Sequence, residues 1–155
     1  MIRLTSQDDT TALISLAEAT GLFEPSQIGS LSQMLIDHFN DKAKTQDFWF
    51  TDYDNEPVSM AYVAPERMTE GTWNLYLIAV HPLHQRQGRG KSMLQHVEKM
   101  LTKKNERILL VETSGTDDFE YVREFYRKSG YEEEARIREF YAAGVDKIVF
   151  RKRLN

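Results

Sequence analysis

The chain has 155 residues, a length suited to one domain with a substantial core. Its 20 basic and 24 acidic side chains give a formal net charge of −4, which argues against bulk nucleic-acid binding. It contains no cysteine, which excludes disulfides, cysteine nucleophiles and cysteine metal sites. Because no signal-peptide pattern and no long apolar run occur, we expect a cytoplasmic protein with no membrane partner.

The first half of the chain predicts a short strand, two helices and a β-hairpin. Ser6 begins a possible capping box, and Pro25 suits the first turn of a helix. Two strand-like runs then flank a turn at Asp54–Pro57. In chain order the expected elements are the strand Met1–Leu4, a helix that ends at Gly21, the helix Pro25–Asn40, and the strands Phe48–Asp52 and Val58–Ala64.

The stretch Trp73–Leu101 has the pattern of a strand, a glycine-rich turn and a helix. Aromatic and branched residues fill Trp73–Val80, and Pro82 ends the strand. Gly88 and Gly90 follow, and apolar residues then recur at helical spacing. The first turn of such a helix has unpaired N–H groups and the positive end of the helix dipole, and glycine allows close approach. With the cations of the turn, the pattern predicts a site for a phosphate-bearing ligand.

Spacing separates the known phosphate-binding patterns. A Walker A loop requires glycine where the chain has Gln85, and a dinucleotide fingerprint requires glycine where Met93 stands. The third pattern is Q/R-x-x-G-x-G/A after a strand that ends in Val-x-Pro, and Val80–Pro82 with Gln85–Gly90 meets it. This resembles the GNAT superfamily of acetyl-CoA-dependent N-acetyltransferases, in which the loop binds the pyrophosphate of coenzyme A. Taken alone, the loop is also compatible with a solvated turn before an ordinary helix.

The rest of the chain predicts a buried strand, a fourth helix and a last hairpin. The strand Arg107–Thr113 follows a crossover helix, which favours a parallel pair with the strand before that helix. Asp117 or Asp118 is expected to cap the fourth helix, and Gly130 to end it. The hairpin strands are Tyr131–Tyr141 and Val145–Leu154.

The order of these elements is that of GNAT folds. The resemblance therefore implies one acetyltransferase domain over residues 1–155 with an α/β (α+β) fold. Such a domain has a mixed, mostly antiparallel central sheet flanked by about four helices, and a parallel strand pair that splays at the cofactor site.

By the same resemblance, acetyl-CoA is the cosubstrate. Its pantetheine arm is expected to pair with the strand before the loop, and its pyrophosphate to meet the N–H groups of the loop. A backbone N–H near Val80 is expected to polarise the acetyl oxygen. The residues implied in cofactor binding are Ile78, Ala79, Val80, Gln85, Arg86, Gln87, Gly88, Arg89, Gly90 and Lys91.

A second motif, Phe125–Tyr131, also resembles the family. There a helix carries a tyrosine followed by x-x-x-Gly-Phe or Gly-Tyr, and the tyrosine protonates the leaving thiolate. Tyr126 has that place. The helical pattern alone favours the interpretation that Tyr126 is one more aromatic residue on a buried stripe, and the resemblance to the family favours the catalytic role. Some members have asparagine seven residues earlier, where this chain has Phe119.

Glu112 is the candidate general base. It ends a buried strand on the same face as Ile108 and Leu110, by period two. A partly desolvated glutamate there could take the proton of the acceptor amine, directly or through water. An ion pair with an arginine, or exposure to solvent, would explain the same residue without catalysis.

The acceptor amine is the least specified part of the prediction, and a small molecule is favoured over a protein. Acidic and aromatic groups suit a cationic amine. The residues expected to line its site are Phe23, Glu24, Tyr76 and Tyr141, with Asp146 near them.

Other functions remain open at this stage. A non-catalytic sensor of acyl-CoA would use the same loop without transferring an acetyl group. A phosphotransferase would use Gly90–Ser92, although glycine is missing at position 85. His81 and His84 have a metal-like spacing but lack a third ligand, so no metal is expected. The protein is expected to be a monomer or a homodimer.

Overall fold

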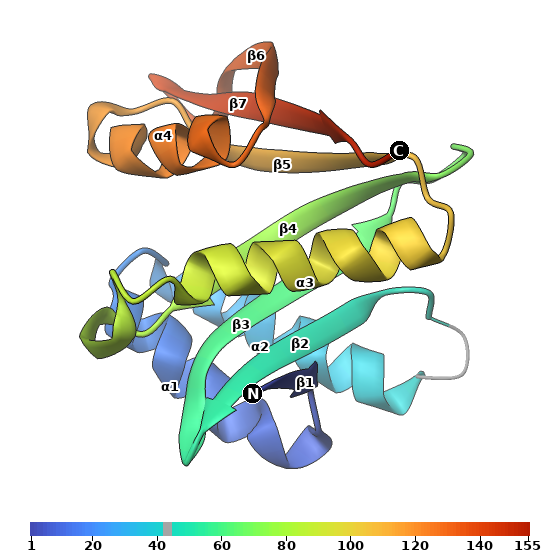
Figure 1. Ribbon diagram of the computed structural model, residues 1–155. Coiled ribbons are helices and arrows are strands. Elements are labelled where there is room, and N and C mark those ends of the chain that lie inside the picture. Colours follow the sequence, from blue (N-terminus) through green and yellow to red (C-terminus); the bar gives the residue numbers. More distant parts are fainter. Residues whose placement is uncertain (42–44) are drawn as a thin grey trace. The chain divides into compact units, whose positions relative to one another are not determined.

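A computed structural model describes residues 1–41 and 45–155. Within this part, seven strands and four α-helices follow one another in the order that the sequence predicts (Figure 1). The strands are ordered β1-β2-β3-β4-β5-β7-β6 in one sheet that is mostly antiparallel, with the parallel pair β4 and β5. The predicted mixed α/β fold class is confirmed.

The strands are β1 Ile2–Leu4, β2 Phe48–Asp54, β3 Glu56–Pro65, β4 Thr72–Val80, β5 Ile108–Ser114, β6 Glu132–Ala142 and β7 Val145–Arg153. The α-helices are α1 Thr10–Thr20, α2 Pro25–Asn40, α3 Arg89–Lys103 and α4 Glu120–Lys128. None of the helices in the described ranges is long and apolar enough to cross a bilayer.

The chain divides into two compact units. The first unit contains Met1–Ala64 and Leu77–Val97, and the second contains Pro65–Tyr76 and Glu98–Asn155. The strand β4 and the helix α3 each contribute residues to both units.

The first unit has an apolar core between its two N-terminal helices and its strands. Gly21 ends α1 in the left-handed conformation, with φ 67°, and Pro25 begins α2. The strands β1, β2 and β3 pair in antiparallel order. The buried side chains that form this core are Leu13, Leu16, Ala17, Leu31, Leu35, Trp49, Met60 and Ala79.

The second unit is organised around β5, which pairs with β4 on one side and with β7 along its whole length on the other (Figure 1). Burial alternates along β5: Leu109 and Val111 are buried, whereas Ile108, Leu110 and Glu112 are partly exposed. This confirms the predicted period-two face of Glu112. The half-exposed face of β5 therefore carries the candidate base.

The predicted start of the fourth helix is wrong. Asp117 and Asp118 lie inside a 3-10 turn, Asp117–Phe119, and α4 begins only at Glu120. Arg123 is buried and donates hydrogen bonds to the carbonyl oxygens of Ser114 and Thr116, at 2.7 and 2.8 Å. A side chain of the helix therefore satisfies carbonyl oxygens of the segment before the turn.

Candidate functional site

The segment Gln85–Gly90, here called the glycine loop, joins β4 to α3 in the first unit. Its entry is fixed by two hydrogen bonds: the N–H of His81 donates to the carbonyl of Val58 at 2.8 Å, and the side-chain amide of Gln85 donates to the carbonyl of Val80 at 3.1 Å. Arg86 and Gly88 have φ values of 61° and 78°. The loop is therefore folded back sharply by two left-handed residues.

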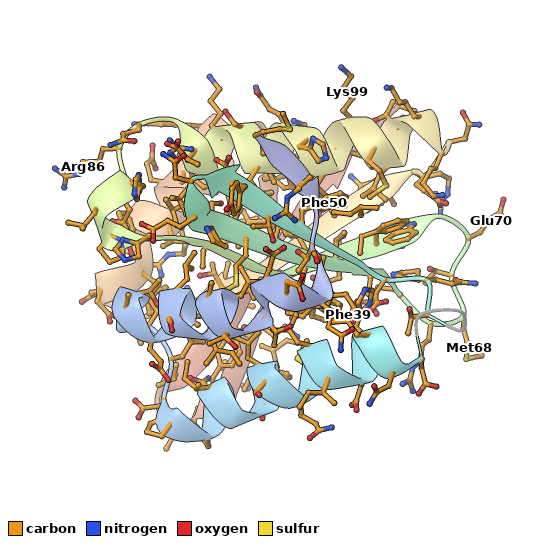
Figure 2. The ribbon with its side chains drawn as sticks, turned by 90° about the horizontal axis from the view of Figure 1, so that it is seen from below. Phe39, Phe50, Met68, Glu70, Arg86 and Lys99 are labelled. Atoms are coloured by element: carbon orange, nitrogen blue, oxygen red, sulfur yellow. The ribbon has the colours of Figure 1, made fainter. Side chains whose placement is uncertain are left out.

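The helix α3 starts within the glycine loop. The N–H of Ser92 donates to the carbonyl of Gly88 at 2.9 Å, which closes the first helical turn. The preceding N–H groups, those of Arg89 to Lys91, have no partner within the helix and point from its positive end. The exposed cations Arg86 and Lys91 flank them, and Figure 2 shows the Arg86 side chain extending outward from the loop. These groups form a donor set for an anion.

Arg89 differs from the other cations of the glycine loop because acidic side chains already hold it. Its guanidinium donates to Asp52 at 2.9 Å and to Asp54 at 2.8 Å. Burial alone would raise the pKa of Asp52, but hydrogen bonds from the Met1 ammonium and from Arg89 outweigh burial and lower it. Arg89 therefore ties the start of α3 to β2. Sequence reasoning missed both aspartates, since they lie more than thirty positions earlier in the chain.

Tyr126 lies on α4 in the second unit, and its side chain is almost completely buried. Its ring contacts those of Phe125, Tyr131 and Phe150, with centroids 5.3 to 5.8 Å apart. Burial raises the pKa of its hydroxyl well above the ordinary value. Among the described residues the hydroxyl forms no hydrogen bond. The group is thus a protonated donor without a protein partner.

Glu112 is held by two side chains that the sequence did not indicate. Its Oε1 accepts a hydrogen bond from Asn74 at 2.9 Å and forms an ion pair with the Nζ of Lys147 at 2.8 Å. The same Asn74 amide nitrogen also donates to Glu66 at 2.9 Å, so two carboxylates share one amide. These contacts occupy one oxygen of Glu112, and its Oε2 makes no contact of this kind in the part of the chain that the structure describes.

Aromatic side chains complete the surroundings of these carboxylates. The hydroxyl of Tyr76 donates to Glu66 at 2.8 Å, and Lys147 lies over the Phe140 ring with its Nζ 4.0 Å from the centroid. Burial, and then the negative charge of Glu112, raise the pKa of Tyr141 to about 12. We call the set of Glu66, Asn74, Tyr76, Glu112, Tyr141 and Lys147 the Glu112 cluster.

The two residues predicted to be catalytic lie on opposite sides of the sheet within the second unit. Glu112 is on the half-exposed face of β5. Tyr126 packs against Phe150, whose partner in the β5–β7 register is Val111 on the buried face. The two candidate catalytic side chains are therefore on opposite faces of the sheet.

The residues predicted to bind the acceptor amine belong to both units. Tyr76 and Tyr141 lie in the Glu112 cluster, whereas Phe23 and Glu24 belong to the first unit. Phe23 packs against the core of that unit, and the Glu24 side chain caps the start of α2. Asp146 forms an ion pair with Arg136, with 2.6 Å between its Oδ2 and the Nη1 of the arginine.

Sequence reasoning missed Glu66, Asn74 and Lys147. Asn74 lies two residues before Tyr76 and therefore on the same face of β4, and this spacing is the sequence signal that could have indicated Asn74.

The rings of His81 and His84 face each other edge to face, with their centroids 5.9 Å apart, and the Nδ1 of His81 accepts from the N–H of Leu83. Within residues 1–41 and 45–155, no three potential metal ligands converge.

Comparisons with known proteins show which family the chain is similar to. Residues 44–133 match a family model described as the acetyltransferase (GNAT) domain. A protein from Desulfovibrio desulfuricans that is assigned to the GNAT acetyltransferases has a structure with 30% identity and a TM-score of 0.94, over 100% of this chain and 99% of that one. No curated protein matches the chain by sequence.

More distant structures share the fold. The ribosomal-protein-S18-alanine N-acetyltransferase from Escherichia coli has 20% identity and a TM-score of 0.79, over 100% of this chain and 94% of that one. The PaiA N-acetyltransferase from Thermoplasma acidophilum, in complex with coenzyme A, has 16% identity and a TM-score of 0.76, over 99% and 98% of the two chains.

Proposed function

The chain belongs to the GNAT acetyltransferase family, and on that premise we propose that it moves an acetyl group from acetyl-CoA to a primary amine. The amine attacks directly while both substrates are bound, with no covalent acyl-enzyme. Holding the two reactants together supplies much of the rate. The acceptor that we favour is a small molecule, and the cytoplasm is the compartment that suits a cysteine-free chain.

The glycine loop is the observation that carries this proposal. Its backbone N–H groups lie at the positive end of α3, beside the exposed Arg86 and Lys91. A pyrophosphate bound there would be held by backbone donors and by two cations. The strand residues Ile78 to Val80 come just before the loop and would pair with the pantetheine arm. The coenzyme A in the PaiA structure supports this choice of cosubstrate.

In this proposal Glu112 removes the proton from the acceptor ammonium. Asn74 and Lys147 hold its Oε1 and thereby orient the carboxylate, so that Oε2 is left for the amine or for a bridging water. The neutral amine then adds to the carbonyl carbon of the thioester. A backbone N–H near Val80 would stabilise the oxyanion of the tetrahedral intermediate.

Tyr126 completes the transfer by protonating the sulfur as the carbon–sulfur bond breaks. Its raised pKa keeps the hydroxyl protonated at neutral pH, and the absence of a protein partner among the described residues leaves the proton available. The nitrogen of the new amide then loses its second proton to water, Tyr126 takes up a proton from solvent, and Glu112 releases to solvent the proton that it took from the ammonium, so that both groups are ready for the next turnover.

A sensor of acyl-CoA without transferase activity is the second candidate. The ion pair between Glu112 and Lys147 favours it, because a carboxylate that is already neutralised has a structural reason to be there. Such a protein would bind the cofactor with the glycine loop and acetylate no amine.

Ligand-dependent thermal unfolding tests the proposal first. Acetyl-CoA, coenzyme A, ATP with magnesium, and NAD are compared in parallel, and an amine panel is then screened for thiol release. We expect stabilisation by acetyl-CoA of about 2.7 kcal/mol at a hundredfold excess over Kd. Thiol release with any amine supports the transferase, whereas stabilisation without release supports the sensor. Stabilisation by ATP alone would overturn both and would make Lys91 and Ser92 the residues to mutate.

A further inference from the structure

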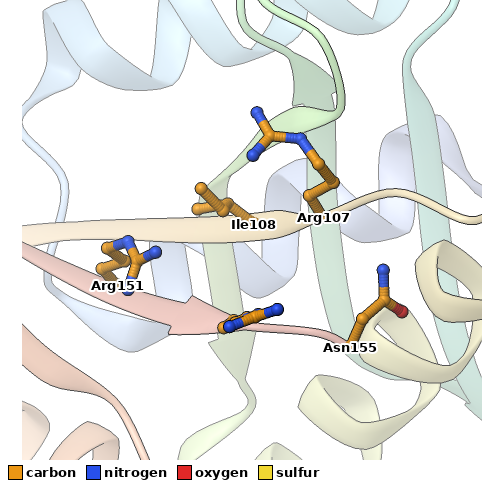
Figure 3. A pocket seen from close by; sticks show the side chains of 5 residues that line it. Arg107, Ile108, Arg151 and Asn155 are labelled. Carbon is orange, nitrogen blue, oxygen red and sulfur yellow. The ribbon is translucent and has the colours of Figure 1, made fainter.

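A cavity of about 290 Å³ lies in the second unit, away from the Glu112 cluster along the same strands. Figure 3 shows the side chains that line it, which come from β5, from β7 and from the residues beside these strands. We call it the arginine pocket, and it is lined by Arg107, Ile108, Arg151, Arg153 and Asn155.

The three arginines of this pocket are not neutralised by carboxylates. Among residues 1–41 and 45–155, none of them forms an ion pair, and the Nε of Arg107 donates to the backbone carbonyl of Glu70, at 2.6 Å. Glu132 stands opposite Arg151 in the β6–β7 register, yet the two form no ion pair within that described part. Three arginine side chains line one cavity, and their positive charges favour an anionic group near it.

The arginine pocket and the Glu112 cluster share one face of the sheet. Ile108 pairs with Arg153, Leu110 with Arg151, and Glu112 with Val149. Paired residues in an antiparallel ladder point to the same side, so this face carries the carboxylate at one end and the arginines at the other. Leu110 lies beside Arg151 and Val149 lies beside Glu112, and both apolar residues are partly exposed. This face therefore has a carboxylate at one end, arginines at the other, and an apolar side chain next to each.

The register fixes the spacing of these ends. Arg151 is two residues from Val149 and Arg153 is four residues from it, which correspond to roughly 7 and 14 Å along a strand. A single extended molecule with an amine at one end and an acid at the other would match both ends over this distance.

We propose that the acceptor is an amine that carries a carboxylate or phosphate roughly 7–14 Å from its nitrogen. The ammonium binds at the Glu112 cluster, the middle of the molecule lies on Leu110 and Val149, and the anion enters the arginine pocket. This assignment rests on the proposed transferase function and narrows its substrate class. Simple diamines, which have a cation at each end, are excluded as good acceptors because they would place a cation among the arginines.

Short peptides test the proposal, because an extended chain of two to four residues spans roughly this length. Peptides with a free C-terminal carboxylate are compared with the same peptides as C-terminal amides, which differ only in that charge. The wild type is compared with the double variant Arg151→Gln/Arg153→Gln. Lys103→Gln is the matched control, because it removes one exposed positive charge of the second unit outside the pocket.

For the wild type we expect KM to be at least tenfold lower for the acids than for the amides. The double variant should lose this preference with kcat nearly unchanged, and Lys103→Gln should keep it. Equal KM values for acids and amides in the wild type overturn the proposal, as does a preference that survives in the double variant. Acetylation of simple monoamines or diamines but of no peptide acid overturns it as well.

A second measurement separates this proposal from failure of the transferase function. Inorganic phosphate is titrated calorimetrically into the wild type and the double variant at constant ionic strength. If no amine is acetylated, the proposed function and the acceptor assignment both fail. Binding of phosphate to the wild type but not to the variant would then retain the arginine pocket as an anion site, and absence of binding would remove that as well.

Discussion

The glycine loop and the Glu112 cluster place their polar groups by different means. The loop offers backbone N–H groups, whose positions follow from where α3 begins, and one of its side chains, Arg89, is already engaged by two aspartates. The cluster offers side chains from β4, β5, β6, β7 and the connection after β3. A backbone site therefore survives most substitutions, whereas a side-chain site depends on every member. Four predictions test this difference.

The largest effect is expected for Glu112→Gln. Loss of the base should lower kcat/KM about 10³-fold near neutral pH, and most strongly at low pH, where more of the acceptor amine is protonated. The matched variant Lys147→Met breaks the same ion pair but keeps the carboxylate. Both variants should lose about 2 kcal/mol of unfolding free energy. Equal losses of activity in the two, flat across pH, would show that the ion pair is structural and that Glu112 is not the base.

Tyr126→Phe is expected to lower kcat about 10²-fold, since the sulfur would leave without its acid. The Kd for acetyl-CoA should stay unchanged, and stability should not fall, because the hydroxyl has no partner among the described residues. Tyr121→Phe on the same helix is the control, because that side chain is 63% exposed. Steady-state thiol release measures kcat, and calorimetry measures the Kd for acetyl-CoA. Full activity in Tyr126→Phe would remove the residue from the mechanism.

Asp52→Asn should weaken the support of the glycine loop without touching its donors. The carboxylate accepts from Arg89 and from the Met1 ammonium, so its loss should lower the unfolding free energy by about 2 kcal/mol at pH 7. The folded pKa of Asp52 is lowered, so its contribution is present above the ordinary value of 3.8 and is lost as pH falls through the folded value. Denaturant unfolding at pH 7 and about pH 3 should therefore show the difference from wild type shrinking in acid. A difference independent of pH would contradict this origin.

Arg86→Met should have the smallest effect of the four. The side chain is exposed and makes no ion pair in the described part, so it contributes to anion binding as a screened charge. We expect acetyl-CoA affinity to fall only a few-fold at low salt, and the loss to shrink as salt is added. The control Lys99→Met removes an exposed charge of α3 outside the loop. A hundredfold loss would mean that Arg86 makes a direct contact that the backbone groups do not replace.

The same difference explains what the sequence could predict. The glycine loop is a local pattern, and its spacing alone indicated where α3 begins. Period two placed Glu112 on the half-exposed face of β5, since alternation is also local. Its partners come from distant segments: Asn74 is 38 positions away, and no pairwise spacing in the sequence indicates that contact.

The errors at α4 have a related cause. Asp117 and Asp118 have the composition of helix caps, but a 3-10 turn occupies their positions, and the buried guanidinium of Arg123 satisfies the nearby carbonyl oxygens. An arginine in a polar stretch normally indicates solvent exposure. Only the tertiary fold shows that this one is buried against the carbonyl oxygens of Ser114 and Thr116.

The division of β4 and α3 between the two units has a consequence for how the protein is made. Each unit consists of two separate stretches of chain, so neither is complete when its first stretch leaves the ribosome. The parallel pair cannot form until Ile108, the partner of Thr72, has been synthesised. In the same way, Met60 cannot pack with Ala79 in the core of the first unit until Ala79 has been synthesised. Such non-local contacts slow folding, because the entropy cost of closing a long loop arises before the contacts between its ends stabilise the chain. During synthesis, strand edges therefore stay unpaired for some time. A chain stalled before Val97 lacks part of both units.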